Sequence, residues 1–520
     1  MCTLLRKKTR GTKGSRRPEK RRKSPDEGEK EGTALRLLNM STEKTIHRPL
    51  SGEDILSHFP FAPSAEQQAA AQGLSRFLDM QGQDRVFILR GYAGTGKTSL
   101  TAALVRALGQ SGRPAVLMAP TGRAAKVMAG YASTTARTIH KQIYAVIPRE
   151  GGGMSFALRA NKTKNAVFIV DEASMLTDRP GESLTDAGSS LLDDLVSYVF
   201  SAPGSRLILV GDRAQLPPVG YDDSPGLEEH TFENNYGLRC TGVDFTQVYR
   251  QQGQSVILHN ATAIRRAMRR AGTLEWGELK FRTGADFVRL EDGYDIQSAI
   301  EGSYSQSGES ETIIITRSNK RAGAFNAQIR SRVRLREGEI ATGDLLMVVK
   351  NNYFWVDEKS PCGFIANGDL AEVMSVRREE QLYGMRFARV ELSLTDYPQM
   401  PKFEALILLD TLYSESAALP EAQARAFFER VMEDYADLPP RQRYEQLAKN
   451  EYYNAIQVKF GYAVTCHKAQ GGGWDNVLIE QVWMASPALS REYLRWLYTA
   501  ITRARKRVYL IGFQDEFFER

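Results

Sequence analysis

Short apolar runs that end in small or acidic residues recur in the first half of the chain. One run begins at Phe87, two cover Val116–Ala119 and Ala166–Val170, and a fourth ends at Val210. Runs this short and this continuous are typical of strands that are buried on both faces of a parallel sheet. Helical patterns follow the first two runs, so the sequence predicts an α/β core.

The run at Phe87 is broken by glycines and continues as a helical pattern. Gly91–Thr98 reads G-x-x-x-x-G-K-T. Glycines let successive N–H groups point at phosphate oxygens, and the start of the helix adds its positive end. Lys97 is expected to neutralise the β- and γ-phosphates, and the Thr98 hydroxyl to ligate Mg²⁺. The pattern predicts a nucleoside triphosphate cradle made by Gly91, Ala93, Gly94, Thr95, Gly96, Lys97, Thr98 and Ser99.

Polar side chains follow the later runs where parallel strands end. Asp171 and Glu172 come directly after one run, and Gln215 follows Val210. Ligands bind at the carboxyl ends of such strands. We therefore expect Asp171 to hold Mg²⁺ through water and Glu172 to polarise the attacking water. The Gln215 amide can report on the γ-phosphate.

In the second half of the chain, continuous apolar runs give way to stretches in which apolar and polar residues alternate. A buried strand is predicted over Thr312–Ile315, followed by a helix that ends near Arg330. The stretches GDLLMVVKNNYFWV and GFIANGDLAEVMSVRRE alternate like short antiparallel strands, with turns at Asn351-Asn352 and Asn367-Gly368. Two helical stretches follow and are broken at Pro439-Pro440.

The composition fits an ordinary globular protein, with 42% hydrophobic and 25% charged residues. No apolar run approaches the roughly 20 residues that span a bilayer, and the N-terminus has no secretory pattern, so we expect no membrane partner. The cysteines are scattered without metal-ligand or disulfide spacing, which favours a reducing, cytoplasmic setting. They are Cys2, Cys240, Cys362 and Cys466.

The positive charge is concentrated at the N-terminus. Residues 1–30 carry twelve basic and four acidic side chains, a surplus that exceeds the net charge of +7 for the whole chain. The rest of the chain is therefore close to neutral, and a nucleic-acid groove would need local clustering. We expect residues 1–45 to be a disordered basic tail. A start at Met40 is an alternative that would leave most of this tail out.

The motifs of the first half resemble superfamily-one (1B) DNA helicases of the RecD/Dda type. The cradle, APTGRAA, TIH, VDEASM and GDRAQLPPVG occur in the order and spacing of that family. The family's first helix carries a glutamine that reads adenine. Here Ser64 is placed as an N-cap and Gln67–Leu78 as an amphipathic helix, so the resemblance implies this role for Gln67. The family writes the helix start as Thr-x-x-Gln, and this chain has serine in place of threonine.

Two later motifs also match the family. In that family they contain arginines of a second domain that contact the nucleotide. VDFTQVYRQ matches the family's Leu-Thr-x-x-x-Arg-Gln, with Phe245 in place of leucine, and implies that Arg250 contacts the γ-phosphate. LRWLYTAITRARKRVYLIG implies the same for Arg503. A guanidinium suits this role because it is always charged and offers paired donors.

The resemblance also implies the residues that contact a nucleic-acid strand. A loop such as Pro120-Thr121-Gly122 can present N–H groups and hydroxyls to phosphates. The motif FGYAVTCHKAQGGGWDNVLIE resembles the family's Tyr-Ala-x-Thr-x-His-Lys-x-Gln-Gly, in which Gln470 and Gly471 couple strand contact to the nucleotide. The implied DNA-binding set is Pro120, Thr121, Gly122, His140, Asn319, Thr465, His467 and Lys468.

A hairpin is predicted between His140 and the Asp171 strand, over about residues 141–165. Its sequence, YAVIPREGGGMSFALRANKTKN, turns at Gly151–Gly153. In Dda-like enzymes a hairpin here is the pin that parts the duplex, and an aromatic tip can stack on the last base pair. Phe156 is the candidate for that tip. The alternative is that Phe156 anchors the hairpin in the protein interior.

The resemblance covers about residues 60–515 and implies two RecA-like P-loop NTPase domains with a hairpin insert and a small SH3-like β-barrel insert. The first RecA-like domain is expected over 46–245. The second is expected over 246–335 and 451–520, with the barrel and its helices between them at 336–450.

The implied activity is that of an ATP- and Mg²⁺-dependent helicase that translocates on single-stranded DNA, 5′ to 3′, and unwinds duplex junctions in repair, recombination or replication. We expect a monomer. One alternative is a nucleic-acid-stimulated ATPase subunit of an exodeoxyribonuclease V-like complex, and another is an RNA translocase, since grooves that track a backbone discriminate sugars poorly. A GTPase switch is disfavoured because NKTK and NKRA both lack the aspartate that reads guanine.

Overall fold

The computed structural model describes residues 48–519 except 81, 83, 149–153, 182, 186–187, 249–254, 358 and 482–487. Residues 49–520 form one compact unit. The predicted tail, residues 1–45, lies outside the described residues. Among the helices of the described part, none is long and apolar enough to cross a membrane.

The first sheet contains all four apolar runs of the first half. Its strands are parallel and lie in the order β3-β2-β6-β7-β1-β8. Their bounds are Ala136–Thr138 (β3), Ala115–Ala119 (β2), Val167–Val170 (β6), Arg206–Gly211 (β7), Arg85–Gly91 (β1) and Arg239–Phe245 (β8). The prediction of a buried parallel sheet is confirmed here.

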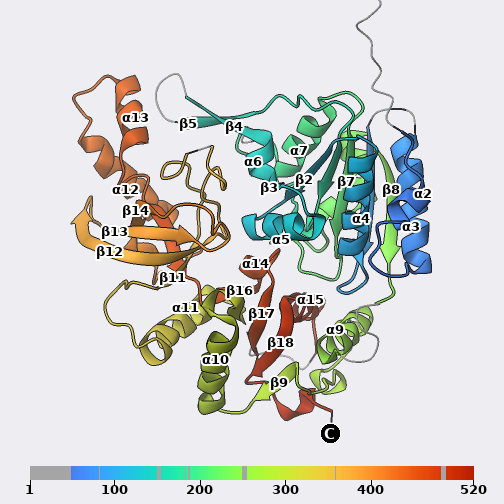
Figure 1. The fold of residues 1–520 in the computed structure, drawn as a ribbon. Coiled ribbons are helices and arrows are strands. Elements are labelled where there is room, and N and C mark those ends of the chain that lie inside the picture. The colour runs from blue at the N-terminus through green and yellow to red at the C-terminus, as the bar shows by residue number, and fades with distance from the viewer. Residues whose placement is uncertain are drawn as a thin grey trace, which may run out of the picture. The chain divides into compact units, whose positions relative to one another are not determined.

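Helices cover both faces of this sheet because successive strand residues point to opposite sides. Phe87 and Leu89 pack with α3 (Ala65–Asp79) and α4 (Lys97–Gln110), whereas Val86 and Ile88 pack with α6 (Ile139–Ile143) and α7 (Leu191–Phe200). Figure 1 shows the two pairs of helices on either side of the sheet. Three further helices are α2 (Gly52–Leu56), α5 (Gly122–Ala132) and α8 (Glu229–Tyr236).

The second sheet is also parallel, in the order β16-β10-β17-β18-β9. Its strands are Ala463–Thr465 (β16), Thr312–Thr316 (β10), Trp474–Glu480 (β17), Ala504–Ile511 (β18) and Phe287–Leu290 (β9). The helices of this region are α9 (Val256–Ala267), α10 (Gly293–Ser307), α11 (Asn319–Gln328), α14 (Cys466–Ala469) and α15 (Arg491–Ile501). Beyond Gln328, α11 continues as a π-helical turn over Ile329–Val333. Two parallel sheets flanked by helices confirm the predicted fold class.

The insert in the second half is a closed five-stranded barrel, as predicted. Its strands are Leu345–Val348 (β11), Leu370–Leu382 (β12), Met385–Leu394 (β13), Phe403–Leu408 (β14) and Ile456–Phe460 (β15). The insert was expected to end at residue 450, but β15 closes the barrel by pairing with both β11 and β14. The expected bounds placed these residues in the second core, although the alternating burial of this strand is the pattern of the antiparallel barrel strands.

The two turns predicted in this insert have different outcomes. Asn367-Gly368 does form a turn before β12, and Gly368 has a φ of 95°, which favours glycine. Asn351-Asn352 does not join two paired strands, because β11 ends at Val348 and β12 begins only at Leu370. Instead Asn352 forms an isolated bridge with Ile365. Residues 349–369 thus form a long excursion from the barrel.

The two helices of the insert are α12 (Glu421–Glu433) and α13 (Pro440–Lys449). The predicted break is confirmed, since α13 begins at Pro440 and the ring of a proline suits the first position of a helix. Phe427 of α12 packs on Phe387 of the barrel, with ring centroids 6.0 Å apart.

A buried charge cluster joins the barrel to the second sheet. Asp344 is fully buried, and its two oxygens accept hydrogen bonds from Arg330 at 3.0 and 2.9 Å. Arg336 and the Tyr462 hydroxyl donate to the same carboxylate at 3.0 and 3.1 Å. A buried carboxylate with this many donors offsets the desolvation of two guanidinium groups.

Asp344→Asn should therefore destabilise the protein strongly. The substitution keeps the shape but leaves two buried guanidinium groups without a countercharge, at a cost of about 3–5 kcal/mol in the free energy of unfolding. Glu404→Gln is the matched control, because its pair with Arg389 is 52% exposed on the glutamate side and should contribute less than about 1 kcal/mol. Urea unfolding of the three proteins measures the difference, and equal stabilities would show that the cluster does not hold the barrel.

Candidate nucleotide site and basic–aromatic cavity

The cradle loop lies between the end of β1 at Gly91 and the start of α4 at Lys97. Gly94 and Gly96 have φ values of 78° and 90°, which disfavour any residue with a side chain. A Cβ at Gly91 would lie 2.7 Å from the Cβ of Phe245. The loop conformation therefore requires glycine at the positions where the motif has it.

The side chains of the cradle are placed for an anionic ligand. The Lys97 ammonium donates to the carbonyls of Gly91 and Tyr92 at 2.6 and 3.0 Å, so it lies over the loop. Thr98 is exposed in the first turn of α4. A lysine, a helix N-terminus and an exposed hydroxyl are the groups that a Mg²⁺-bound triphosphate needs.

Gln67 contacts the cradle from α3. Its side chain is buried, its Nε2 donates to the Thr95 carbonyl at 3.3 Å, and a Cβ at Gly96 would lie 2.2 Å from that nitrogen. Its Oε1 accepts the N–H of Ser64 at 3.0 Å, which completes a capping box with that residue. The predicted adenine reader is thus also the residue that fixes the start of the helix.

The predicted acidic pair lies at the carboxyl end of β6. Asp171 accepts from the Tyr131 hydroxyl at 2.7 Å and from the N–H of Glu172 at 2.8 Å. Burial, and then the charge of Glu172, raise the pKa of Asp171. Glu172 has a φ of 53°, an uncommon value for a residue with a side chain.

Arg503 reaches this pair from the second sheet. Its Nη1 lies 3.5 Å from Oε1 of Glu172, and it also donates to the carbonyls of Gly472 and Thr499. Only 5% of its side chain is exposed. The structure therefore brings the predicted Arg503 to the predicted Glu172. The other predicted arginine, Arg250, lies outside the described residues.

The loop that carries Gln215 is held from both sides. Gln215 is buried, and in the described part of the chain its Oε1 has no hydrogen-bond partner. Gln470 of the second sheet donates to the carbonyl of the next residue, Leu216, at 2.7 Å. Gln470, for which the resemblance implies a coupling role, therefore contacts the residue next to Gln215.

The predicted DNA-contact residues lie at helix starts of both sheets. Thr121 is the N-cap of α5, with Pro120 before it and Gly122 after it, and Asn319 begins α11. A Cβ at Gly471 would meet the Thr121 hydroxyl oxygen at 2.9 Å, so Gly471 lies beside this predicted strand-contact residue. Thr465 is the N-cap of α14, the short helix that contains His467 and Lys468.

The charge states of these residues follow from burial. Burial lowers the pKa of His140 to about 4, so its ring is neutral at pH 7, and burial also lowers the pKa of His467. Burial, and then the charge of Lys459, lower the pKa of Lys468 to about 8. The Lys468 ammonium donates to the side chain of Asn367 in the barrel at 3.4 Å. The histidines thus offer hydrogen bonds, and the lysine offers charge.

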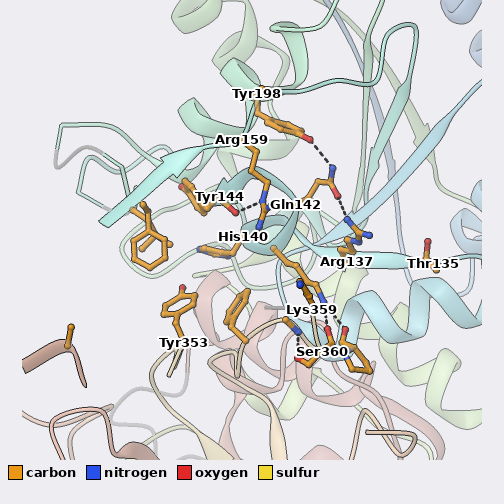
Figure 2. Close-up of a pocket in the computed structure, with 18 of the residues that line it drawn as sticks. Thr135, Arg137, His140, Gln142, Tyr144, Arg159, Tyr198, Tyr353, Lys359 and Ser360 are labelled. Atoms are coloured by element: carbon orange, nitrogen blue, oxygen red, sulfur yellow. Dashed lines mark hydrogen bonds between the residues drawn. The ribbon is translucent and has the colours of Figure 1, made fainter. Parts of the chain in front are cut away.

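A cavity of about 1210 Å³ lies between the first sheet's hairpin and the barrel insert. Figure 2 shows His140, Tyr144 and Arg159 on one side, with Tyr353, Lys359 and Ser360 opposite. Its basic lining residues are Arg137, Lys141, Arg159, Lys359, Arg441 and Lys449, against the single acidic residue Glu445. Its large aromatic residues are Tyr144, Phe156, Tyr198, Tyr353 and Phe364.

The hairpin itself is present, as β4 (Tyr144–Pro148) paired with β5 (Met154–Leu158). Phe156 is not at its tip, because it pairs with Val146, two positions inside the last pair of the ladder. Its ring lies 4.9 Å from Tyr353 of the barrel insert. Strand alternation points Phe156 at the cavity, so the expectation of an aromatic tip was wrong for this residue. The predicted tip, Gly151–Gly153, lies outside the described residues.

Sequence reasoning missed the half of the cavity that the insert supplies. Tyr353 and Phe364 stand 4.8 Å apart in the long excursion between β11 and β12. Lys141 donates to the Pro361 carbonyl of the same excursion at 2.7 Å. The aromatic run Tyr353-Phe354-Trp355 beside basic residues was the available signal, since such interleaving is typical of single-strand binding surfaces.

The chain resembles known helicases. Family models match an AAA domain over residues 63–278 and a UvrD-like helicase C-terminal domain over residues 460–511. The chain is 26% identical over 461 residues to the ATP-dependent RecD2 DNA helicase of Deinococcus radiodurans, a match that covers 86% of the chain and 50% of that protein. It is 33% identical over 150 residues to the ATP-dependent DNA helicase Pif1 of Bdellovibrio bacteriovorus, covering 27% of the chain and 31% of that protein.

A solved structure is also similar over most of the chain. The Bacteroides Pif1 helicase in complex with ADP-AlF3 and single-stranded DNA is 17% identical, with a TM-score of 0.45, and the match covers 88% of this chain and 95% of that one. The chain spans half of the length of the Deinococcus relative. The family models and the Deinococcus relative confirm the resemblance to superfamily-one helicases of the RecD type.

Proposed function

We propose that the chain is an ATP-dependent DNA helicase that moves along single-stranded DNA from 5′ to 3′ and parts the duplex at a junction. The observation that carries the proposal is the contact between Arg503 and Glu172, 3.5 Å apart, because it brings an arginine of one sheet to the carboxylate beside the cradle of the other. Such an arginine stabilises the charge of a transferring phosphoryl group. The names of the Deinococcus and Bdellovibrio relatives support the DNA helicase assignment.

The cradle residues divide the chemistry of hydrolysis. Lys97 exchanges the loop carbonyls for the β- and γ-phosphates, and Glu172 orients the attacking water. Thr98 and Asp171 would hold Mg²⁺, which neutralises charge on the phosphates. Gln215, whose buried amide oxygen is without a partner in the described residues, is placed to respond when the γ-phosphate leaves.

The cavity supports single-stranded DNA as the second ligand. Its basic residues suit a phosphate backbone, and its aromatic rings give stacking surfaces that accept any base. One wall comes from the hairpin and α6, and the other from the barrel insert, which is continuous with the core of the second sheet. Movement between the two sheets would therefore change the grip on the strand, which is how a nucleotide cycle can drive translocation.

We also propose a monomer in the cytoplasm that serves repair, recombination or replication. One chain supplies the residues of both the cradle and the cavity. Among the described residues, Cys240, Cys362 and Cys466 are free thiols, which supports a reducing compartment.

Strand displacement on two matched substrates tests the proposal. A duplex with a 5′ single-stranded tail should be unwound with ATP, and the same duplex with a 3′ tail should not. Lys97→Ala is the control, since it should lose hydrolysis and unwinding while it still binds the tail.

Three results would contradict parts of this account. DNA-stimulated hydrolysis without displacement of either substrate would favour the ATPase-subunit alternative. Stronger stimulation by single-stranded RNA than by DNA would favour an RNA translocase. Hydrolysis by Lys97→Ala within a few-fold of wild type would remove the cradle assignment.

Phe156→Ala should weaken single-strand binding and unwinding more than hydrolysis at saturating DNA. Loss of one stacking surface costs about 1–3 kcal/mol per base, or roughly 5- to 150-fold in affinity. Tyr294→Ala is the matched control, because Tyr294 is an aromatic residue on α10 that is 80% exposed and does not line the cavity. Fluorescence anisotropy, ATPase and displacement assays are compared with the melting temperature of each variant. Equal losses in all activities, together with a lower melting temperature, would mean that Phe156 only anchors the hairpin.

A further inference from the structure

Tyr498 connects the cradle loop to the second sheet. It lies on α15, and only 1% of the residue is exposed. Its hydroxyl oxygen accepts the backbone N–H of Ala93, in the cradle loop, at 2.9 Å. The same hydroxyl donates to Oδ2 of Asp212 at 2.7 Å. Three elements that are distant in sequence thus meet at one buried oxygen atom.

The direction of these hydrogen bonds is fixed. Asp212 also accepts the N–H of Ala214 at 2.8 Å, so its carboxylate is oriented from two sides. Burial, and then the charge of Asp212, raise the pKa of Tyr498 well above its usual value, so its proton stays on the hydroxyl, which donates to Oδ2 of Asp212. The free lone pair is left for the cradle N–H of Ala93. A phenylalanine ring would fill the same space and make neither bond.

The loop that begins at Asp212 is held at its other end too. The N–H of Leu216 donates to the hydroxyl of Thr499, the neighbour of Tyr498 on α15, at 2.8 Å. Gln215 lies between these two attachment points. The guanidinium of Arg503 donates to the carbonyl of Thr499 at 3.1 Å. Both groups expected to act on the γ-phosphate, Gln215 and Arg503, are therefore attached to the same end of α15.

We propose that Tyr498 is a positioning residue that couples occupancy of the cradle to α15. The inference rests on the proposed ATPase function and deepens it. Through Tyr498 the cradle loop, the Asp212–Leu216 loop and the Arg503 segment change position together. Removal of the hydroxyl leaves Lys97 and the cradle glycines in place, so nucleotide still binds. Gln215 and Arg503 are then no longer aligned with the bound phosphate, so turnover falls.

The chain contains a matched control on the same helix. Tyr493 is also 1% exposed and lies on α15, but in the described part of the structure its hydroxyl has no hydrogen-bond partner. Tyr493→Phe therefore removes a buried hydroxyl that makes no hydrogen bond within the described residues. Tyr498→Phe removes the one that bridges Ala93 and Asp212. A role in packing alone predicts the same activity for both variants.

Steady-state ATPase measurements with and without single-stranded DNA distinguish a positioning role of Tyr498 from a role in packing alone. Tyr498→Phe should lower the DNA-stimulated kcat by about tenfold, the effect of losing hydrogen bonds to a charged group, with a KM for ATP within about threefold of wild type. Tyr493→Phe should keep both constants within about twofold. Equal kcat values for the two variants, or loss of nucleotide binding in Tyr498→Phe alone, would overturn the inference.

Hydrogen exchange provides a readout that does not need turnover. Binding of a non-hydrolysable ATP analogue should slow amide exchange in residues 212–223 of wild type and of Tyr493→Phe, but not of Tyr498→Phe. Protection in all three proteins, or in none, would overturn the coupling role. The three proteins could show the predicted difference in exchange while wild type does not hydrolyse ATP. That result would contradict the proposed function and would still support the coupling through Tyr498.

Discussion

The arrangement of the two sheets depends on a buried guanidinium that needs acceptors from both of them. Arg503 is nearly inaccessible to water, and its contacts are the carbonyls of Gly472 and Thr499 on its own side and the carboxylate of Glu172 on the other. A buried charge without such partners is costly, so the contact with Glu172 favours the arrangement in which the two sheets meet at this point. The same contact places the Arg503 guanidinium next to the acidic pair that was predicted from the sequence.

The barrel connects the second sheet, which carries Arg503 to the nucleotide site, with one wall of the cavity. Asp344 ties the start of the barrel to Arg330 of the second sheet, and β15 closes the barrel immediately before β16. The barrel is therefore continuous with the second sheet, whereas the hairpin wall of the cavity belongs to the first. Under the proposed function, a change in the contact at Arg503 would move the two walls of the cavity relative to each other, because they are attached to different sheets.

Much of the nucleotide site follows from local rules in the sequence. The glycines of the cradle, the capped helix with Gln67 and the acids after a buried strand are each encoded within a few neighbouring residues. Features that depend on distant pairing were not predictable in this way. The strand Ile456–Phe460 lies beyond the residues expected for the insert, and its pairing with β11 and β14 shows that it closes the barrel.

The roles of single side chains in the interface were also not predictable, because they depend on residues that are distant in the sequence. Tyr498 resembles any aromatic residue on the apolar face of a helix, and its role appears only when Ala93 and Asp212 are brought to it. Phe156 was assigned to a hairpin tip because the turn was expected nearby. The ladder places it two pairs back, opposite Tyr353, a residue of an excursion that no local pattern connects with the hairpin.

We propose that Arg503 completes the nucleotide site from the side of the second sheet. The most direct test is the DNA-stimulated kcat for ATP of Arg503→Lys, measured with its affinity for a fluorescent ATP analogue. Lysine keeps the positive charge but loses the planar paired donors, so the account predicts a fall in kcat of about a thousandfold, in the range of arginine fingers, with little change in nucleotide affinity. A kcat within a few-fold of wild type would contradict the claim.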